Sequence, residues 1–341
     1  MPRLNEEIRT AALSAPLSLR FTGSTAGELT AWQAQFASKL RELIGPHEPP
    51  ARWEVRALGT ESLADHVREE ILLTAEGLLS QPLYILRPRA PAETRFPVVV
   101  CLHGHGLGHD TTVGRGDSPA LADQIRRLNY DYGLKLARAG YLVVAPGMIP
   151  FGRRLDDETR TQKSDPCAIA FVRLMMLGRT VVGENVRGVR WALNYALERP
   201  DTRPDRVGCV GLSYGGRMTM IVAALDPRIR VAVLSGVLNL WQERMLRHDY
   251  SCGAQVIPGI LEYGDTAEIG SLIAPRSAIW EVGSRDPHIV PGWDEQAAER
   301  LRRAYAASGR PEALSFHHFD GAHEWNGETA VPLLLRELKS P

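Results

Sequence analysis

The sequence lacks an excess of charge of either sign. Its 341 residues include 40 Lys and Arg and 40 Asp and Glu, so the formal net charge is zero. No long block of like charge interrupts the chain. Binding to nucleic acid without sequence preference depends on a basic surface. We therefore expect no nucleic-acid partner.

Cysteine is also scarce. The four cysteines contain no C-x-x-C pair, which argues against a disulfide framework or a zinc ribbon and favours a reducing compartment. No stretch reaches the roughly 18 consecutive apolar residues of a membrane-spanning helix. Residues 1–23 lack the charged and apolar regions of a signal peptide. The sequence therefore predicts a cytoplasmic protein with no membrane partner.

The chain has enough apolar residues, 44%, for a large core, and its pattern changes along its length. Apolar residues three or four apart predict an amphipathic helix within residues 25–45, and residues 52–89 alternate like two or three antiparallel strands. We predict an N-terminal helical extension over 1–50. The remainder, 51–341, is one large domain with an insertion at about 147–180. The extension could cover its own sheet or the sheet of a second copy, and the second arrangement would be a homo-oligomer.

Six apolar strands alternate with helical segments in the second part of the chain. They are predicted at 97–102, 141–146, 206–213, 230–236, 277–283 and 313–319. Continuous apolar strands separated by helices are typical of a parallel sheet with helices on both faces, so we predict an α/β fold. Ligands of such sheets bind at the carboxyl ends of the strands. The residues that follow each strand are therefore the candidates for a functional site.

The segment Gly211-Leu212-Ser213-Tyr214-Gly215 directly follows one of these strands and precedes a helical segment. A G-x-S-x-G pattern between a strand and a helix is typical of a nucleophile elbow. Glycine is needed at both ends because side chains there would collide across the tight turn. We predict that Ser213 is a nucleophile.

A serine nucleophile needs a general base and an acid that orients the base. The expected chain order is Ser, Asp, His. Asp286 follows a later strand, and His323 follows the last strand. Asp320 and Asp249 are alternative acids, of which Asp320 is close in sequence to the histidine. The sequence therefore predicts Ser213, Asp286 and His323 as catalytic residues.

The loop after the strand at 97–102 begins with two histidines separated by one glycine, His103 and His105. Two backbone N–H groups usually stabilise the oxyanion formed by attack on a carbonyl. We assign them to Tyr214, which follows the nucleophile, and to His105. In an alternative, His103, His105 and His109 bind zinc in a metal-dependent hydrolase. The rings of an H-x-H pair in an extended segment point to opposite sides, so the preferred prediction includes no metal and no cofactor.

Taken together, these motifs resemble those of the α/β-hydrolase superfamily, and more narrowly of dienelactone-hydrolase-like and acetyl-xylan-esterase-like serine esterases. The resemblance covers about residues 66–338 and rests on VVVCLHGHG, GLSYGG, EVGSRDP and FDGAHEW. It implies a mostly parallel eight-stranded sheet in a catalytic domain. It also implies hydrolysis of short-acyl carboxylic esters through a Ser-His-Asp triad and an acyl-enzyme.

Two points limit what the resemblance implies. Dienelactone hydrolases themselves use a cysteine nucleophile, so lactone chemistry is not carried over to Ser213. A peptidase or amidase of the same fold would use the same triad and is the alternative activity. The expected partner is a small-molecule ester.

The substrate is expected to contact the segments that interrupt the alternation of strands and helices, because long loops are often functional. Apolar side chains in these segments could form the wall of a pocket. Ordinary packing is the alternative for each of them. The substrate-binding residues predicted on this basis are Met148, Phe151, Trp241 and Trp325.

Overall fold

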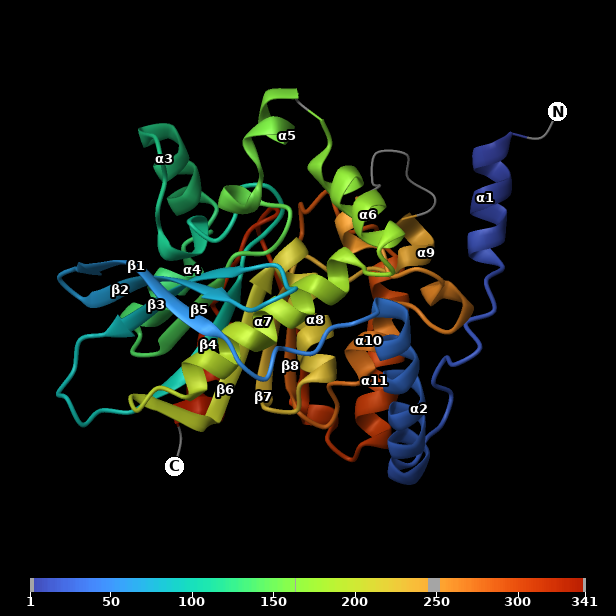
Figure 1. Ribbon diagram of the computed structural model, residues 1–341. Helices are drawn as coiled ribbons and strands as arrows, with labels where there is room; N and C mark the ends of the chain where they lie inside the picture. The colour runs from blue at the N-terminus through green and yellow to red at the C-terminus, as the bar shows by residue number, and fades with distance from the viewer. Residues whose placement is uncertain (1–2, 163, 245–251, 340–341) are drawn as a thin grey trace.

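A nine-stranded mixed sheet forms the centre of the protein in the computed structural model, which describes residues 3–162, 164–244 and 252–339 (Figure 1). The strands are β1 (Glu54–Ser62), β2 (His66–Thr74), β3 (Gln81–Pro88), β4 (Phe96–Leu102), β5 (Leu142–Pro146), β6 (Thr202–Leu212), β7 (Ile229–Ser235), β8 (Ser277–Gly283) and β9 (Leu314–Phe319). Their order in the sheet is β1-β2-β3-β5-β4-β6-β7-β8-β9. The strands from β1 to β3 pair antiparallel, as do β3 and β5, and all later pairs are parallel.

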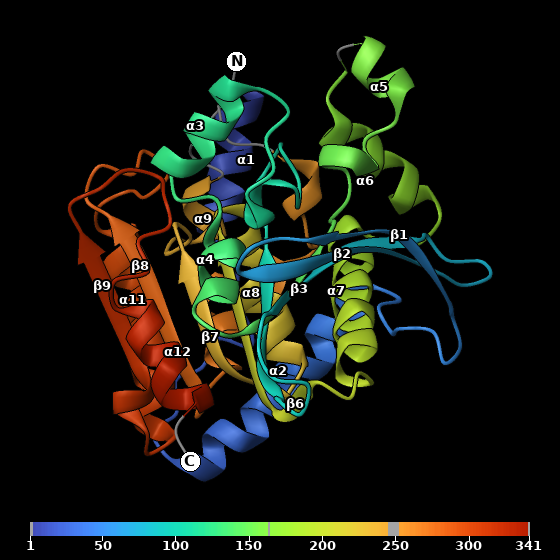
Figure 2. The ribbon, with the colours of Figure 1, turned by 90° about the vertical axis from the view of Figure 1, so that its left-hand side faces the viewer.

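The predicted α/β fold is confirmed, with nine strands in place of the eight expected. Each apolar run predicted as a parallel strand forms one, and β4, β5 and β8 are buried along their whole length. The difference lies in the antiparallel part, which contains three strands. There β1 is exposed throughout and pairs with β2 at one edge of the sheet, opposite β9 (Figure 2). Backbone pairing, and not burial of side chains, therefore places β1.

Helices cover both faces of the sheet, as the alternating pattern predicted. They are α1 (Leu4–Leu13), α2 (Ala26–Ile44), α3 (Pro119–Arg127), α4 (Tyr132–Arg138), α5 (Asp157–Gln162), α6 (Pro166–Met176), α7 (Val181–Leu197), α8 (Tyr214–Leu225), α9 (Trp241–Arg244), α10 (Thr266–Ser271), α11 (Trp293–Ala307) and α12 (Ala330–Lys339). Side chains of α4 and α12 pack on one face together with Val99 and Cys101 of β4. Those of α2, α7, α8, α10 and α11 pack in the other cluster, with Val98 and Val100. Successive residues of β4 thus enter opposite layers of the core.

The predicted amphipathic helix near the N-terminus is α2. It begins with a capping box, in which Thr25 and Glu28 satisfy each other's backbone N–H groups. Its apolar face contacts α8, α10 and α11. The buried residues of that face are Leu29, Trp32, Phe36, Leu40 and Ile44. The segment predicted as an N-terminal extension therefore contributes to the same core as the sheet, whereas α1 has no buried residue.

No single helix in the described ranges is long and apolar enough to cross a membrane. The helices α6 and α7 reach that length and composition only as a pair, and they are bent by 92° relative to each other.

Candidate active site

Ser213 lies in the tight turn between β6 and α8. Its backbone has φ 59° and ψ −121°, a region that residues with a side chain rarely adopt. Two hydrogen bonds hold this conformation: Ser213 N donates to Ser235 O at 2.9 Å, and Arg217 N donates to Ser213 O at 3.0 Å. The turn therefore places Ser213 at the carboxyl end of β6, directly before the helix.

The two glycines of the G-x-S-x-G pattern permit close backbone contacts in this turn. A Cβ atom on Gly211 would overlap the carbonyl oxygen of Gly215. A Cβ atom on Gly215 would overlap the carbonyl oxygen of Leu102, at the end of β4. Both glycines are thus required by space. The same contact brings the loop after β4 next to the start of α8.

Asp286 and His323 lie together although they follow different strands, β8 and β9. His323 Nδ1 is 2.7 Å from Asp286 Oδ2, and the Asp286 side chain is 1% exposed. The other carboxylate oxygen, Oδ1, accepts a hydrogen bond from the backbone N–H of His288 at 2.8 Å. This geometry lets Nδ1–H of His323 donate to the carboxylate, which leaves Nε2 as an acceptor. That Nε2 atom is buried and has no hydrogen-bond partner among the described residues.

The alternative acids do not take this place in the described structure. Asp320 is exposed and forms an ion pair with Arg285. Asp249 lies outside the described residues. Asp286 is therefore the acid that contacts His323.

Ser213 and His323 open onto one cavity of about 540 Å³, a volume typical of pockets for small molecules. Other described residues that line it come from the loop after β4, from the start of α6 and from the segments around residues 130, 255 and 288. They are Gly104, His105, Leu107, Thr111, Tyr130, Tyr132, Asp165, Cys167, Leu212, Cys252, Gln255 and His288. Elements far apart in the sequence thus meet around the serine and the histidine.

Comparison with known proteins identifies the family. A family model described as the Abhydrolase family matches residues 20–330. The chain belongs to this family. The predicted resemblance to α/β-hydrolases is thereby confirmed, and the protein is a hydrolase with this fold.

Individual relatives agree with this assignment. The hydrolase is 28% identical over 306 residues to a Bacillus subtilis (strain 168) protein named "Putative hydrolase YtaP". The matched region covers 88% of this chain and 95% of the relative. A crystal structure of a "putative acetyl xylan esterase" from Bacteroides fragilis NCTC 9343 has a TM-score of 0.81 at 18% identity, covering 98% of this chain and 95% of that chain. A glucuronoyl esterase from Solibacter usitatus has a TM-score of 0.65 at 15% identity, and the match covers 92% of this chain and 93% of that chain. At these identities the structural similarity shows a shared fold.

The two predicted oxyanion donors of the hydrolase belong to segments that flank the nucleophile. Tyr214 is the first residue of α8, where backbone N–H groups have no partner within the helix. In the loop after β4, a Cβ atom on Gly104 would lie 3.8 Å from the Cβ atom of Ser213. His105 follows in the same loop and lines the cavity. The fold thus brings both segments to the carboxyl end of β6.

The four residues predicted to bind substrate require a correction. None of them is among the described residues that line the cavity with Ser213. Met148, Phe151 and Trp325 are buried in the core, where Phe151 packs behind the cavity against the rings of His105 and Tyr214, at 4.7 and 4.8 Å. Trp241 lines a neighbouring cavity. An apolar side chain in a long loop is here part of the core because the loop itself is packed.

The cavity wall contains residues that the sequence did not single out, among them Tyr130, Tyr132 and His288. Of these, only His288 carried a local signal, since it lies two residues after Asp286. Its ring packs edge-on against that of His323, with centroids 4.5 Å apart. Tyr130 precedes α4 and Tyr132 is its first residue, in the connection between β4 and β5, and only the fold brings them to the cavity.

The alternative zinc site of His103, His105 and His109 is wrong in the described structure. His103 uses both ring nitrogens within the protein: Nδ1 donates to Gly104 O at 2.8 Å, and Nε2 accepts from Met148 N at 2.9 Å. Burial lowers the pKa of His103 to about 4 and that of His109 to about 3, so both rings are structural and neutral. The ring of His105 points elsewhere, toward the cavity.

Proposed function

We propose that the protein is a serine hydrolase that cleaves carboxylic esters of short acyl groups. One observation carries this proposal. A serine in a strained elbow and a histidine bonded to a buried aspartate open onto the same small-molecule cavity. The esterase names of the structurally similar proteins support the ester as the bond that is cleaved.

The proposed mechanism follows from these positions. His323 Nε2 takes the proton of Ser213 Oγ while Oγ attacks the ester carbonyl. The backbone N–H groups of Tyr214 and His105 stabilise the oxyanion. The protonated imidazole, oriented by Asp286, then donates its proton to the leaving alcohol. Water that is deprotonated by His323 hydrolyses the acyl-serine and restores the enzyme.

The composition of the cavity wall favours an uncharged ester. No lysine or arginine is among the described residues that line the cavity, whereas Asp165 is. A carboxylate on the substrate would therefore meet no lysine or arginine there, and its loss of hydration would not be offset by such a partner. An acetyl ester of a neutral alcohol fits this wall.

The decisive test replaces Ser213. We expect Ser213→Ala to lower the turnover of p-nitrophenyl acetate by at least about 10⁴-fold and to abolish labelling by a fluorophosphonate probe. Ser308→Ala, at the end of α11 and outside the cavity, is the matched control and should keep full activity. Undiminished turnover by the folded Ser213→Ala variant would refute the serine mechanism.

A substrate panel tests the specificity. Rates with p-nitrophenyl esters should fall as the acyl chain lengthens from acetyl to octanoyl. A rise beyond hexanoyl would contradict the short acyl group. Faster cleavage of matched anilides than of the esters would instead support the peptidase or amidase alternative.

A further inference from the structure

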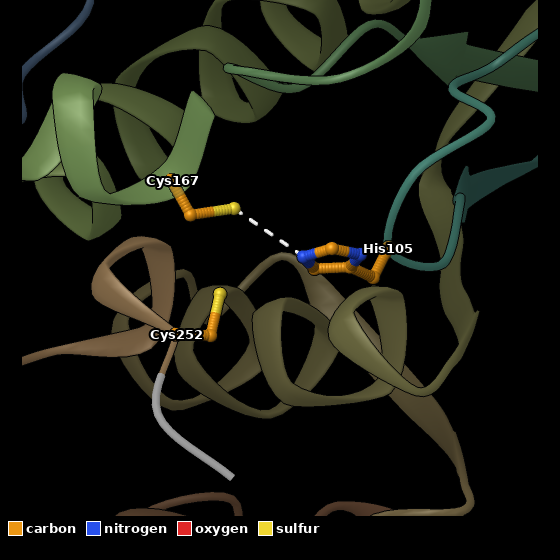
Figure 3. A group of neighbouring side chains, drawn as sticks. All are labelled: His105, Cys167 and Cys252. Atoms are coloured by element: carbon orange, nitrogen blue, oxygen red, sulfur yellow. Dashed lines mark hydrogen bonds between the residues drawn. The ribbon is translucent and has the colours of Figure 1, made fainter. Parts of the chain in front are cut away.

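Three side chains that the proposed mechanism does not use meet at the wall of the cavity: His105, Cys167 and Cys252. His105 comes from the loop after β4, Cys167 from the first turn of α6, and Cys252 from the segment before the short helix at Gly253–Gln255. Figure 3 shows the three side chains pointing toward one another. Their ligand atoms, one nitrogen and two sulfurs, all lie within 4.8 Å of one another.

The distances suit a tetrahedral metal site. Cys167 Sγ lies 3.3 Å from His105 Nε2. Zinc binds sulfur at about 2.3 Å and imidazole nitrogen at about 2.0–2.1 Å, so two ligands of a tetrahedral site are about 3.5–3.8 Å apart. The three side chains therefore need only small shifts to share one ion. The other two cysteines, Cys101 and Cys209, are buried within strands of the sheet.

A thiol binds metal in its deprotonated form, so an ion that binds at Cys167 and Cys252 displaces their protons. Cys167 is the second residue of α6, and its backbone N–H donates to the Asp165 side chain that caps this helix. The capped first turn of α6 therefore positions the Cys167 side chain beside His105.

All three side chains line the cavity that also contains Ser213. A metal held by three protein ligands at such a wall keeps one coordination position for a molecule from the cavity, as in sites with three protein ligands and one water. A disulfide between Cys167 and Cys252 would use only two of the three converging groups and would not account for the orientation of the His105 ring.

We propose that His105, Cys167 and Cys252 form a binding site for a thiophilic divalent cation, Zn²⁺ above all, with the fourth coordination position open to the cavity. The site shares His105 with the proposed oxyanion hole, but it uses the imidazole of that residue and not its backbone N–H, so binding of the ion can be measured apart from ester hydrolysis.

Titration of the reduced full-length protein with Co²⁺ tests the proposal, since thiolate ligands give Co²⁺ a strong charge-transfer absorption. We expect one Co²⁺ per chain, displaced by one Zn²⁺. Cys167→Ser and Cys252→Ser should each weaken Co²⁺ binding by at least about 100-fold. Cys209→Ser is the matched control, because this cysteine is buried beside Thr219 in the core, and it should bind like the wild type.

Two results would overturn the proposal. One is the same Co²⁺ affinity and spectrum for the wild type and the double cysteine variant. The other is no Co²⁺ binding by the reduced wild type, together with loss of two thiols in air, which would identify a Cys167–Cys252 redox pair instead. If a cysteine variant fails to fold, as judged by circular dichroism, His105→Gln replaces it with the same expected weakening. The titration is repeated on Ser213→Ala, which should bind Co²⁺ unchanged, so failure of the serine mechanism leaves this result intact.

Discussion

At the residue scale, Gly236 controls how closely the backbone approaches the candidate base and acid. It follows β7 with φ +66°, and a Cβ atom there would lie 2.8 Å from His323 Cε1 and 3.2 Å from Asp286 Oδ2. No local motif selects this glycine, because it lies at the end of an ordinary apolar strand. Its role depends on two loops that arrive from β8 and β9.

Replacing Gly236 by alanine should therefore displace the imidazole. We expect Gly236→Ala to lower kcat/KM by about 100-fold, because displacement of a reacting group by about 1 Å has an effect of this size. Gly309→Ala is the control: its φ is +73°, but a Cβ atom there meets no heavy atom within 4 Å. Both variants bear the cost of a left-handed backbone, so equal loss of activity would show that contact with His323 is irrelevant.

The buried histidine His103 makes the stability of the fold depend on pH. Its pKa is lowered to about 4 by burial, whereas an unfolded histidine titrates near 6.5. The unfolded chain therefore binds a proton that the folded chain excludes, and stability is complete above about pH 6.5 and falls as the pH drops toward 4. The loss from His103 alone is about 3 kcal/mol.

His103→Gln should remove this proton linkage while it keeps an acceptor for the N–H of Met148. The free energy of unfolding, measured with urea from pH 7 to pH 4, should then decline less steeply than in the wild type. The difference between the two slopes should correspond to about one proton bound on unfolding. The exposed His318 gives the control variant, His318→Gln, whose pH profile should match that of the wild type. A profile of His103→Gln that is parallel to the wild type would contradict the buried neutral ring.

At the scale of elements, burial explains which segments could be predicted. Strands such as β4 are apolar throughout because both faces are covered, so composition alone located them. The elbow at Ser213 is equally local, since five consecutive residues define it. In contrast, β1 is exposed along its length and is defined by pairing with β2, and the loop residue Phe151 belongs to the core although its sequence suggested a pocket wall.

The helix α2 provides an energetic test of the N-terminal segment. Phe36 is fully buried, stacks on Trp32 at 5.3 Å and lies in the core shared with the sheet. Phe36→Ala should lower the free energy of unfolding by about 3–5 kcal/mol, without changing kcat/KM at temperatures where the variant is folded. Ile8→Ala, on the exposed face of α1, should change stability by less than about 0.5 kcal/mol. A small effect at Phe36 would indicate that α2 is an appendage.

At the scale of the whole molecule, the balance of charge predicts how substrates arrive. The formal net charge is zero, and no lysine or arginine is among the described residues of the cavity wall. Long-range steering of a charged substrate should therefore be weak. We expect kcat/KM for a neutral acetate ester to change by less than about twofold between low and high ionic strength. A steep fall with added salt for an anionic ester would contradict this view.

The candidate site as a whole could be predicted only in part. Chain order related Ser213 to Asp286 and His323, because the topology of such sheets orders the strand ends. No chain order of this kind predicts that His105, Cys167 and Cys252 converge, since their meeting depends on the path of two long connections. Contacts between loops are set by packing in three dimensions, which spacing in one chain does not encode.

The order of the strand ends also determines when activity can arise during synthesis. The ribosome completes the elbow at Ser213 more than 100 residues before His323, and β9 must join the edge of the sheet before the imidazole reaches Asp286. In the proposed mechanism, a nascent chain therefore carries its serine without a base until nearly all of the domain has emerged. Hydrolysis by this mechanism would begin only on a finished sheet, and its onset would report completed folding directly.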